Sequence, residues 1–213
     1  MAADVLTRFD DDARTALQRQ RSSQNDGVMR LADAYGETKY ALAAGGLLYI
    51  GGIAIGEERV RTTGRLAFES LLVSGVITTS LKYVLGRARP FLDEGQGSFT
   101  PFPGLRNDSR FSLPSGHTTV AFTLSTVLAK RINNTYASIG LYSAAGLTGL
   151  ARMYYDKHWL TDVLAGAAVG YLSATWILNI HESNSVQSQA QSQSSFRCFL
   201  SPTPGGVSFT AIW

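Results

Sequence analysis

The stretch ARMYYDKHWLTD, residues 151–162, places an arginine, a histidine and an aspartate between two long uncharged segments. If the chain is helical from His158 onward, His158 and Asp162 are four residues apart and share one face. A carboxylate there can hold the imidazole in one tautomer and stabilise its positive charge, as a nucleophilic or basic histidine requires. Arg152 adds a planar cation suited to phosphate oxygens. Taken alone, the stretch slightly favours a simpler interpretation, a helix start with an interfacial histidine.

Uncharged segments dominate the middle of the chain and predict its fold. There are five of them, at Tyr40–Gly56, Ser70–Leu81, Phe111–Ala129, Ile132–Ala151 and Val163–Ile180. Each, the second with its flanking residues, is near the lower limit of about 17–25 residues for a membrane span. Their Gly, Ala, Ser and Thr content is typical of tightly packed helices in a bilayer, and also of a compact soluble bundle. Five such segments leave little polar surface for a soluble bundle, so we expect an all-α bundle of about five packed, membrane-spanning helices.

The two ends of the chain differ from this expected catalytic helical core, residues 40–182. Residues 1–39 are polar and carry apolar side chains at helical spacing, at Leu6, Phe9, Ala13 and Leu17. This pattern predicts an N-terminal amphipathic helical arm, which could lie on a membrane surface or cap the core.

Residues 183–213 form a third region. The Ser/Gln-rich stretch Ser183–Ser195 predicts a flexible linker. The segments Phe196–Leu200 and Val207–Trp213 flank a turn-forming Pro/Gly stretch and predict a short terminal hairpin.

Charge and cysteine content exclude several classes of protein. The net charge is +3 over 213 residues without long Lys/Arg runs, so we expect no nucleic-acid partner. The single cysteine, Cys198, excludes an internal disulfide framework and a cysteine-based metal cluster. No basic segment followed by an apolar run occurs near the start, so the sequence predicts no signal peptide.

A pair of cations lies at the end of the second uncharged segment. Lys82 and Arg89 are seven residues apart, which is two helical turns, so both would point to one face if the helix persists to Pro90. Two buried cations are costly without an anion to meet them, although basic residues at a helix end usually extend to water.

The stretch LPSGHTT, residues 113–119, opens the third uncharged segment. Pro114 suits a first helical turn, and Ser115 and Gly116 can offer backbone N–H groups to a phosphate at a helix N-terminus. His117 then lies beside the anion, where it can donate a proton. Alone, such a stretch is also a common helix start.

Together these residues resemble the type 2 phosphatidic acid phosphatase (PAP2) superfamily, which includes class A acid phosphatases and vanadium haloperoxidases. The family's first motif, Lys-x6-Arg-Pro, is matched by Lys82, Arg89 and Pro90. Its second, Pro-Ser-Gly-His, is matched by residues 114–117. Its third, Ser-Arg-x5-His-x3-Asp, is matched by Arg152, His158 and Asp162, with Ala151 in place of the serine. The motifs follow in the family's order over residues 82–162.

The resemblance implies metal-free phosphoryl transfer through a phosphohistidine, with no cofactor. In it His158 is the nucleophile, Asp162 orients it, and His117 protonates the leaving oxygen. The implied phosphate-binding residues are Lys82, Arg89, Ser115, Gly116 and Arg152.

The resemblance also implies a substrate and a location. The leading hypothesis is an integral membrane phosphatase that hydrolyses a phosphate monoester or pyrophosphate of a membrane lipid, with its site on the extracytoplasmic (periplasmic) side. With five helices the N-terminal arm falls on the face of the site, which leaves room for an upstream signal or a sixth helix outside this chain.

Two alternatives stay open. One is a soluble acid phosphatase or vanadium-dependent haloperoxidase with the same anion pocket, against which the short chain and uncharged helices argue. The other is an inactive relative that binds or transports lipids, which would be marked by loss of a nucleophile or phosphate ligand.

Overall fold

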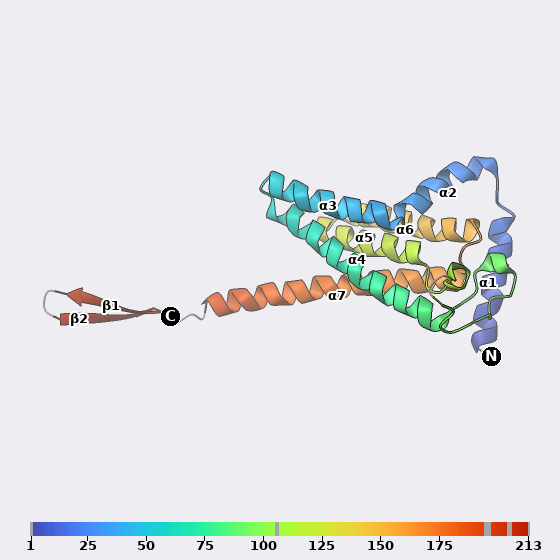
Figure 1. Ribbon diagram of the computed structural model, residues 1–213. Coiled ribbons are helices and arrows are strands. Elements are labelled where there is room, and N and C mark those ends of the chain that lie inside the picture. The colour runs from blue at the N-terminus through green and yellow to red at the C-terminus, as the bar shows by residue number, and fades with distance from the viewer. Residues whose placement is uncertain (1, 105–106, 194–196, 204–205, 213) are drawn as a thin grey trace. The chain divides into compact units, whose positions relative to one another are not determined.

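The computed structural model describes residues 2–104, 107–193, 197–203 and 206–212 and divides into two compact units, Met1–Ile177 and Leu178–Trp213. Seven α-helices follow in order, α1 (Ala2–Gln18), α2 (Ser23–Tyr35), α3 (Thr38–Ala54), α4 (Glu58–Leu85), α5 (Gly116–Ile132), α6 (Thr135–Tyr154) and α7 (Leu160–Gln193). Two 3₁₀ turns, Pro90–Leu92 and Asp108–Arg110, lie between α4 and α5. The strands β1 (Arg197–Thr203) and β2 (Gly206–Ile212) follow α7. The predicted all-α bundle with a terminal hairpin is therefore confirmed (Figure 1).

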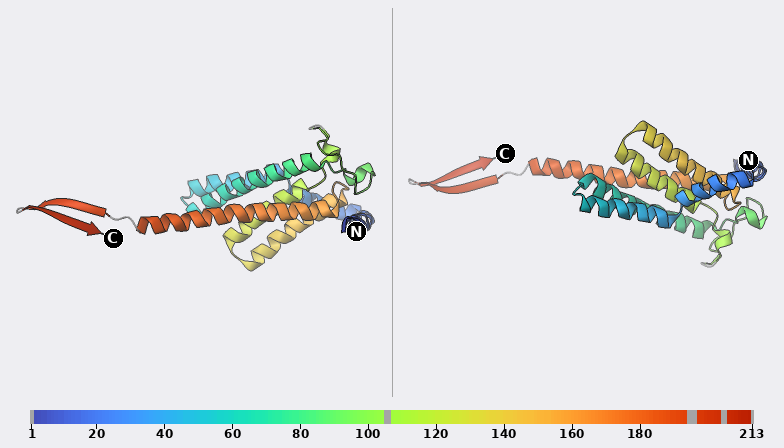
Figure 2. Two further views of the ribbon diagram at one scale, coloured as in Figure 1. Left: turned by 90° about the horizontal axis from the view of Figure 1, so that it is seen from below. Right: turned by 90° about the horizontal axis from the view of Figure 1, so that it is seen from above.

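Two helical hairpins build the first unit, with α3 packed along α4 and α5 along α6 (Figure 2). The turn between α5 and α6 is made by two asparagines. Asn133 ends α5 in the left-handed conformation, which asparagine tolerates well. Asn134 caps α6, since its side chain accepts a hydrogen bond of 3.0 Å from the N–H of Ala137. The sequence thus specifies this reversal locally.

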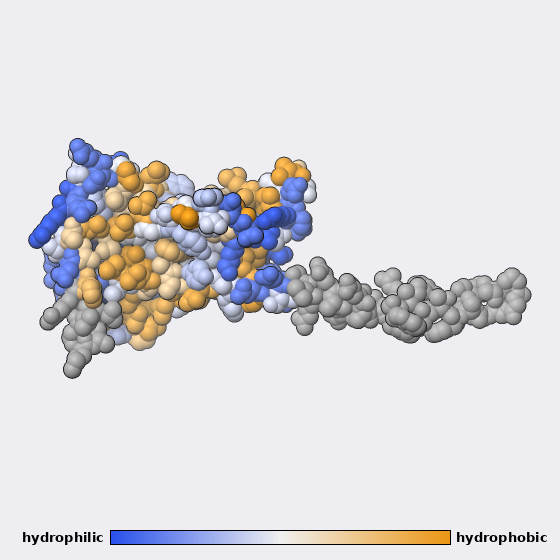
Figure 3. All heavy atoms as spheres, turned by 180° about the vertical axis from the view of Figure 1, so that it is seen from behind, coloured by the Kyte–Doolittle hydropathy of each residue, from blue (hydrophilic) through white to orange (hydrophobic). Residues whose placement is uncertain are grey.

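Many small polar residues lie among the apolar residues of the interior of the first unit, and large apolar residues cover much of its outside. The fully buried polar side chains include Ser70, Ser74, Thr119, Thr123, Thr126 and Thr148. The exposed apolar side chains include Leu47 (73% exposed), Leu72 (61%), Ile139 (60%) and Leu172 (63%). In Figure 3 apolar residues cover much of the middle of the visible face, and hydrophilic residues gather toward its ends. An outer surface this apolar, over helices packed through small residues, is unusual for a water-soluble bundle and typical of helices packed in lipid.

Two described helices are long and apolar enough to cross a membrane, Glu58–Leu85 and the segment Leu160–Asn184. The other core helices are shorter or less apolar than this criterion requires; α3 and α5 each have 17 residues. Five core helices are therefore present as expected, and length with hydropathy identifies two of them as candidate spans.

Close packing between α5 and α7 sets the position of the first turn of α7. A side-chain carbon at Gly166 would lie 2.5 Å from the carbonyl oxygen of Ser115, and one at Gly170 would lie 2.5 Å from that of Thr119. Only glycine allows so close an approach. The N-terminus of α5 and the first turns of α7 are thereby brought together.

The N-terminal arm consists of two helices, α1 and α2, that belong to the same compact unit as the core. The Tyr154 hydroxyl donates to Asp26 over 2.7 Å, and Thr148 donates to the carbonyl of Ala32 over 2.7 Å. The Gln18 amide donates to the carbonyl of Met153 over 2.9 Å. These contacts show that the arm caps the core, which is one of the two positions expected for it.

The second unit contains the end of α7 and the hairpin. The expected flexible linker at Ser183–Ser195 is wrong as far as Gln193, because α7 continues to that residue. Gln and Ala are good helix formers, so the polar composition did not exclude a helix. The strands β1 and β2 pair antiparallel, with Arg197 opposite Ile212 and Thr203 opposite Gly206. Of the predicted strand ends, Phe196 and Trp213 lie outside the described residues.

Candidate active site

The helix that carries Lys82 does not continue to Pro90. α4 stops at Leu85 because Gly86 adopts the left-handed conformation (φ 58°), where a side-chain carbon would lie 1.7 Å from the carbonyl oxygen of Thr100. The condition for Lys82 and Arg89 to share one helix face, a helix that persists to Pro90, is therefore not met. Arg89 lies on a non-helical segment after the turn.

Both cations of the first motif are held by the chain that follows it. The Lys82 ammonium donates to the carbonyls of Phe111 and Ser112. The Arg89 guanidinium donates to the carbonyl of Asp108 over 3.0 Å and to its carboxylate over 2.9 Å. Burial lowers the pKa of Arg89, Asp108 opposes this shift, and the nearby Arg152 cation adds to it. The two arginines of the first and third motifs are thus close enough to interact.

The second motif forms the N-terminus of α5, with Ser115 as the N-cap and Gly116 as the first helical residue. The backbone N–H of Ser115 donates to the carbonyl of Asp162 over 2.9 Å, so, contrary to expectation, it is not available to a phosphate. The Ser115 hydroxyl accepts a hydrogen bond of 2.9 Å from Thr118 and keeps its own proton to donate. Next to Gly116 the space is open, and the nearest atom to a side-chain carbon there would be Cε of Lys82 at 3.9 Å. The start of α5 therefore faces Lys82.

His117, in the first turn of α5, contacts the N-terminal arm. Its Nε2 lies 3.0 Å from a carboxylate oxygen of Glu37, the residue before α3. Gly36 permits this contact, since a side-chain carbon there would lie 2.6 Å from the carbonyl oxygen of His117. A histidine paired with a carboxylate in this way can hold a proton for transfer.

Arg152, at the end of α6, is 8% exposed and also meets the arm. Its Nη1 donates to Asp33 over 2.7 Å. Its Nε is buried and has no hydrogen-bond partner among the described residues. A buried guanidinium N–H without a partner is costly, so it marks a place where an anion would be favourable.

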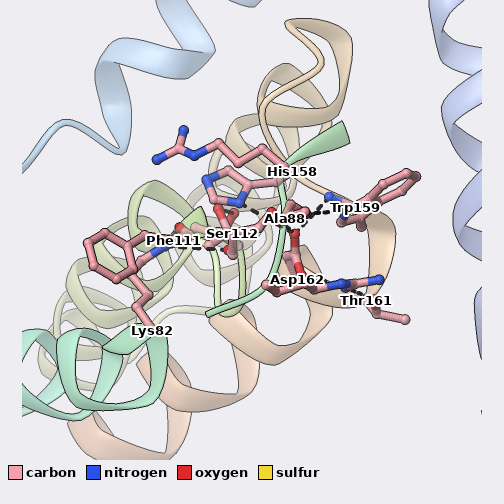
Figure 4. Close-up of polar contacts among 12 residues, drawn as sticks. Lys82, Ala88, Phe111, Ser112, His158, Trp159, Thr161 and Asp162 are labelled. Atoms are coloured by element: carbon pink, nitrogen blue, oxygen red, sulfur yellow. Dashed lines mark hydrogen bonds and ion pairs between the residues drawn. The ribbon is translucent and has the colours of Figure 1, made fainter. Parts of the chain in front are cut away.

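His158 and Asp162 form the centre of the site (Figure 4). His158 is 4% exposed and Asp162 is fully buried, with Nδ1 of the histidine 3.6 Å from Oδ2 of the aspartate. This separation is longer than a hydrogen bond. Burial lowers the pKa of His158 to about 3, while Asp162 opposes this shift and the cations of Lys82 and Arg152 add to it. The imidazole is therefore neutral at neutral pH, the form with a free electron pair.

Three donors fix the carboxylate of Asp162. Arg87 Nη1 donates to Oδ1 over 2.6 Å, and Oδ2 accepts from the Ser112 hydroxyl and from the backbone N–H of Trp159 over 2.9 Å. Figure 4 shows Ser112, Trp159 and Asp162 gathered around His158. The aspartate cannot rotate without losing these bonds, so it holds one orientation toward the imidazole.

Sequence reasoning missed several residues that contact the site, namely Asp10, Asp33, Glu37, Arg87, Ser112 and Thr161. Arg87 carried a signal, because it stands inside the first motif, two residues before Arg89, and would share a face with Arg89 in an extended segment. The carboxylates of the arm carried none, since they lie among many exposed charged residues.

The sequence-predicted residues from all three motifs thus lie at one end of the helical core. Contacts between α4, α5, α6 and the start of α7 bring these groups together. The groups are three cations, the open N-terminus of α5, and a neutral buried imidazole with its carboxylate. Such a set can bind a phosphate-like anion and attack it with a histidine nitrogen.

Comparisons with known proteins identify the fold and the family of this chain. A lipid A 1-phosphatase of Rhizobium etli is 34% identical over 112 residues, which are 50% of this chain and 45% of the relative, so the match spans about half of either protein. The crystal structure of Aquifex aeolicus LpxE has a TM-score of 0.61 at 24% identity, covering 79% of this chain and 93% of that one. The structure of a transmembrane PAP2-type phosphatidylglycerolphosphate phosphatase from Bacillus subtilis has a TM-score of 0.65 at 23% identity, covering 82% of this chain and 85% of that one. These two likenesses concern the fold. The PAP2 superfamily profile matches residues 64–185, more than half of the chain, and the protein therefore belongs to the PAP2 superfamily.

Proposed function

We propose that this protein is an integral membrane phosphatase that removes phosphate from a phosphorylated membrane lipid through a phosphohistidine. The observation that carries the proposal is the buried, neutral His158 beside the fixed carboxylate of Asp162, within reach of the charges of Lys82 and Arg152. Family membership supports the same reaction class.

In the proposed reaction, His158 attacks phosphorus through Nε2, because its Nδ1 faces Asp162. A nitrogen–phosphorus bond forms as the phosphorus–oxygen bond to the lipid breaks, and His117 gives its proton to the leaving oxygen. Glu37 holds the Nε2 of His117 until the substrate's leaving oxygen replaces the carboxylate. A water molecule deprotonated by His117 then attacks phosphorus, which releases phosphate and the free imidazole.

The phosphate oxygens are assigned to the cations and to the start of α5. Lys82, Arg89 and the unpartnered Nε of Arg152 would neutralise the charge that spreads over three oxygens in the transition state. The Ser115 hydroxyl and the backbone N–H of Gly116 complete the set. No residue in this scheme requires a metal or another cofactor.

A lipid substrate is supported by the outer surface of the protein. The large exposed apolar side chains of α3, α4, α6 and α7 would be stable in a bilayer and unfavourable in water. An apolar groove of about 600 Å³ along α3 and α4 is lined by Leu42, Phe68 and Leu72, and at one end by Thr38, which follows Glu37. A hydrocarbon chain in this groove would have its head group near His117. We place the site on the extracytoplasmic side by family resemblance.

The test compares the rates at which the protein, in detergent, hydrolyses a panel of phosphorylated lipids and a panel of water-soluble phosphate esters. A lipid A-type glycolipid phosphate belongs in the panel because a relative carries that name. We expect preference for lipids, full activity in EDTA, loss of turnover in His158→Ala and retained turnover in the control His181→Ala. A strong preference for soluble esters would overturn the membrane-lipid assignment. Dependence on metal, or an active His158→Ala variant, would overturn the mechanism.

A further inference from the structure

The N-terminal arm contributes a buried carboxylate that lies close to the site. Asp10 of α1 is 1% exposed and stands outside the residues 64–185 that match the superfamily. Its Oδ1 accepts the backbone N–H of Thr161 over 2.8 Å, and its Oδ2 accepts the Thr161 hydroxyl over 2.7 Å. A carboxylate at the first turn of α7 is favourable because it meets the positive end of the helix dipole. By itself, this contact would only cap the N-terminus of α7.

Arg87 extends the contact from Asp10 to the catalytic carboxylate. Its Nη2 donates to Asp10 over 2.7 Å, while Nη1 donates to Asp162 over 2.6 Å and to the Thr161 hydroxyl over 2.7 Å. The Arg87 side chain is 4% exposed, so both ion pairs are shielded from water. The planar guanidinium cannot turn toward one carboxylate without losing its bonds to the other. Asp10 therefore restricts the orientation in which Arg87 presents its N–H groups to Asp162.

The orientation of Asp162 matters because it decides what faces His158. Arg87 binds Oδ1, which leaves Oδ2 to face Nδ1 of His158 at 3.6 Å. Building on the proposed function, we infer that Asp10 is a positioning residue of the reaction, acting through Arg87 and Asp162 on the nucleophile His158. The arm is thus part of the catalytic apparatus rather than only a cover.

Other carboxylates of the arm also contact residues of the site. Asp33 binds Arg152 and Glu37 binds His117, so carboxylates of residues 1–39 meet three parts of the site. α1 is also docked independently of Asp10, since Arg14 binds Asp156 with two hydrogen bonds of 2.7 Å. The removal of the Asp10 charge should therefore leave the arm in place.

The test is Asp10→Asn in the full chain, with Asp11→Asn as the matched control. Asparagine keeps an oxygen for the N–H of Thr161, so the cap survives while the ion pair to Arg87 is lost. Asp11 is exposed on the same helix, and its replacement changes the net charge equally. We expect kcat to fall about 10- to 100-fold with little change in KM in Asp10→Asn, as for small misplacements of catalytic groups, and no fall in the control.

A double-mutant cycle with Asp162→Asn separates positioning from a structural role. If Asp10 acts through Asp162, the kcat loss from Asp10→Asn should shrink to less than about twofold in the Asp162→Asn background, since coupled residues are not additive. Losses that multiply in a folded protein, or full activity of Asp10→Asn, would overturn the inference.

Thr161→Val provides a second test if Asp10→Asn does not fold. It removes the hydroxyl that bonds to both Asp10 and Arg87. Its kcat should also fall, and this loss should also shrink to less than about twofold in the Asp162→Asn background. Losses that multiply in a folded protein, or full activity of Thr161→Val, would again overturn the inference. An inactive wild type, or an active His158→Ala, would refute the proposed function and the inference together. An active wild type with inactive His158→Ala and undiminished Asp10→Asn would refute the inference alone.

Discussion

Arg87→Gln removes the cation that lies between two buried carboxylates. Asp10 is 1% exposed and Asp162 is 0% exposed, and each forms an ion pair with one nitrogen of Arg87. Glutamine is shorter and neutral, so it leaves both carboxylates without their positive partner. Breaking a buried pair in this way typically costs about 3–5 kcal/mol, because an uncompensated charge stays in a poorly solvated position.

The five hydrogen bonds that Arg87 donates support the upper part of that range. Besides the two carboxylates, it binds the Thr161 hydroxyl and, with two nitrogens, the carbonyl of Gln96. A glutamine amide can replace at most two of these bonds. For a chain of this size, about 2–4 °C per kcal/mol converts the loss into a fall in Tm of about 6–20 °C.

The assay is thermal unfolding in detergent, with Arg110→Gln as the control. Arg110 undergoes the same chemical change, but its partner Glu94 is 38% exposed, so water can solvate the charge that is left. We expect a clear fall in Tm for Arg87→Gln and little change for Arg110→Gln. Equal Tm values for the two variants would refute the assignment of Arg87 as the centre of a buried charge network.

Further predictions concern pH and helix packing. Because the pKa of His158 is about 3 in the folded protein and about 6.5 in the unfolded chain, only the unfolded chain takes up this proton between those values. The free energy of unfolding should therefore fall, relative to His158→Gln, by up to about 1.4 kcal/mol for each pH unit below 6.5, and parallel pH curves would contradict this. Gly166→Val should lower Tm and activity because the new side chain would meet the Ser115 carbonyl. Gly140→Ala should lower neither, because the space next to Gly140 is open. Equal effects of the two substitutions would argue against close packing of α5 and α7.

The proposed site residues could be predicted from the sequence because the superfamily is recognised by short motifs. Lys82, Ser115 and His158 could be named because three short motifs together resemble those of the superfamily, and each motif places its residues on one local segment. The geometric reason given for the first motif was nevertheless wrong, because Gly86 ends the helix before Arg89. A glycine near a helix end is a stop signal, and a seven-residue spacing between two cations does not contain that signal.

In residues 183–213, one element was predicted correctly and the segment before it was not. Its hairpin was predicted from a Pro/Gly turn between two apolar segments, and strands Arg197–Thr203 and Gly206–Ile212 confirm it. The linker before it was assigned from composition, and composition does not distinguish a polar helix from a flexible segment.

The sequence by itself determined the helical class, the order of the helices and the residues of the three motifs, because periodicity, uncharged segments and motif spacing are local properties of the chain. Only the tertiary structure decided that Asp10 meets Arg87, 77 residues away, and through it Asp162. It likewise decided that Asp33 and Glu37 reach Arg152 and His117. The physical reason is that a buried ion pair depends on which surfaces pack together, and an aspartate on a polar helix has the same local pattern whether it faces water or a catalytic site.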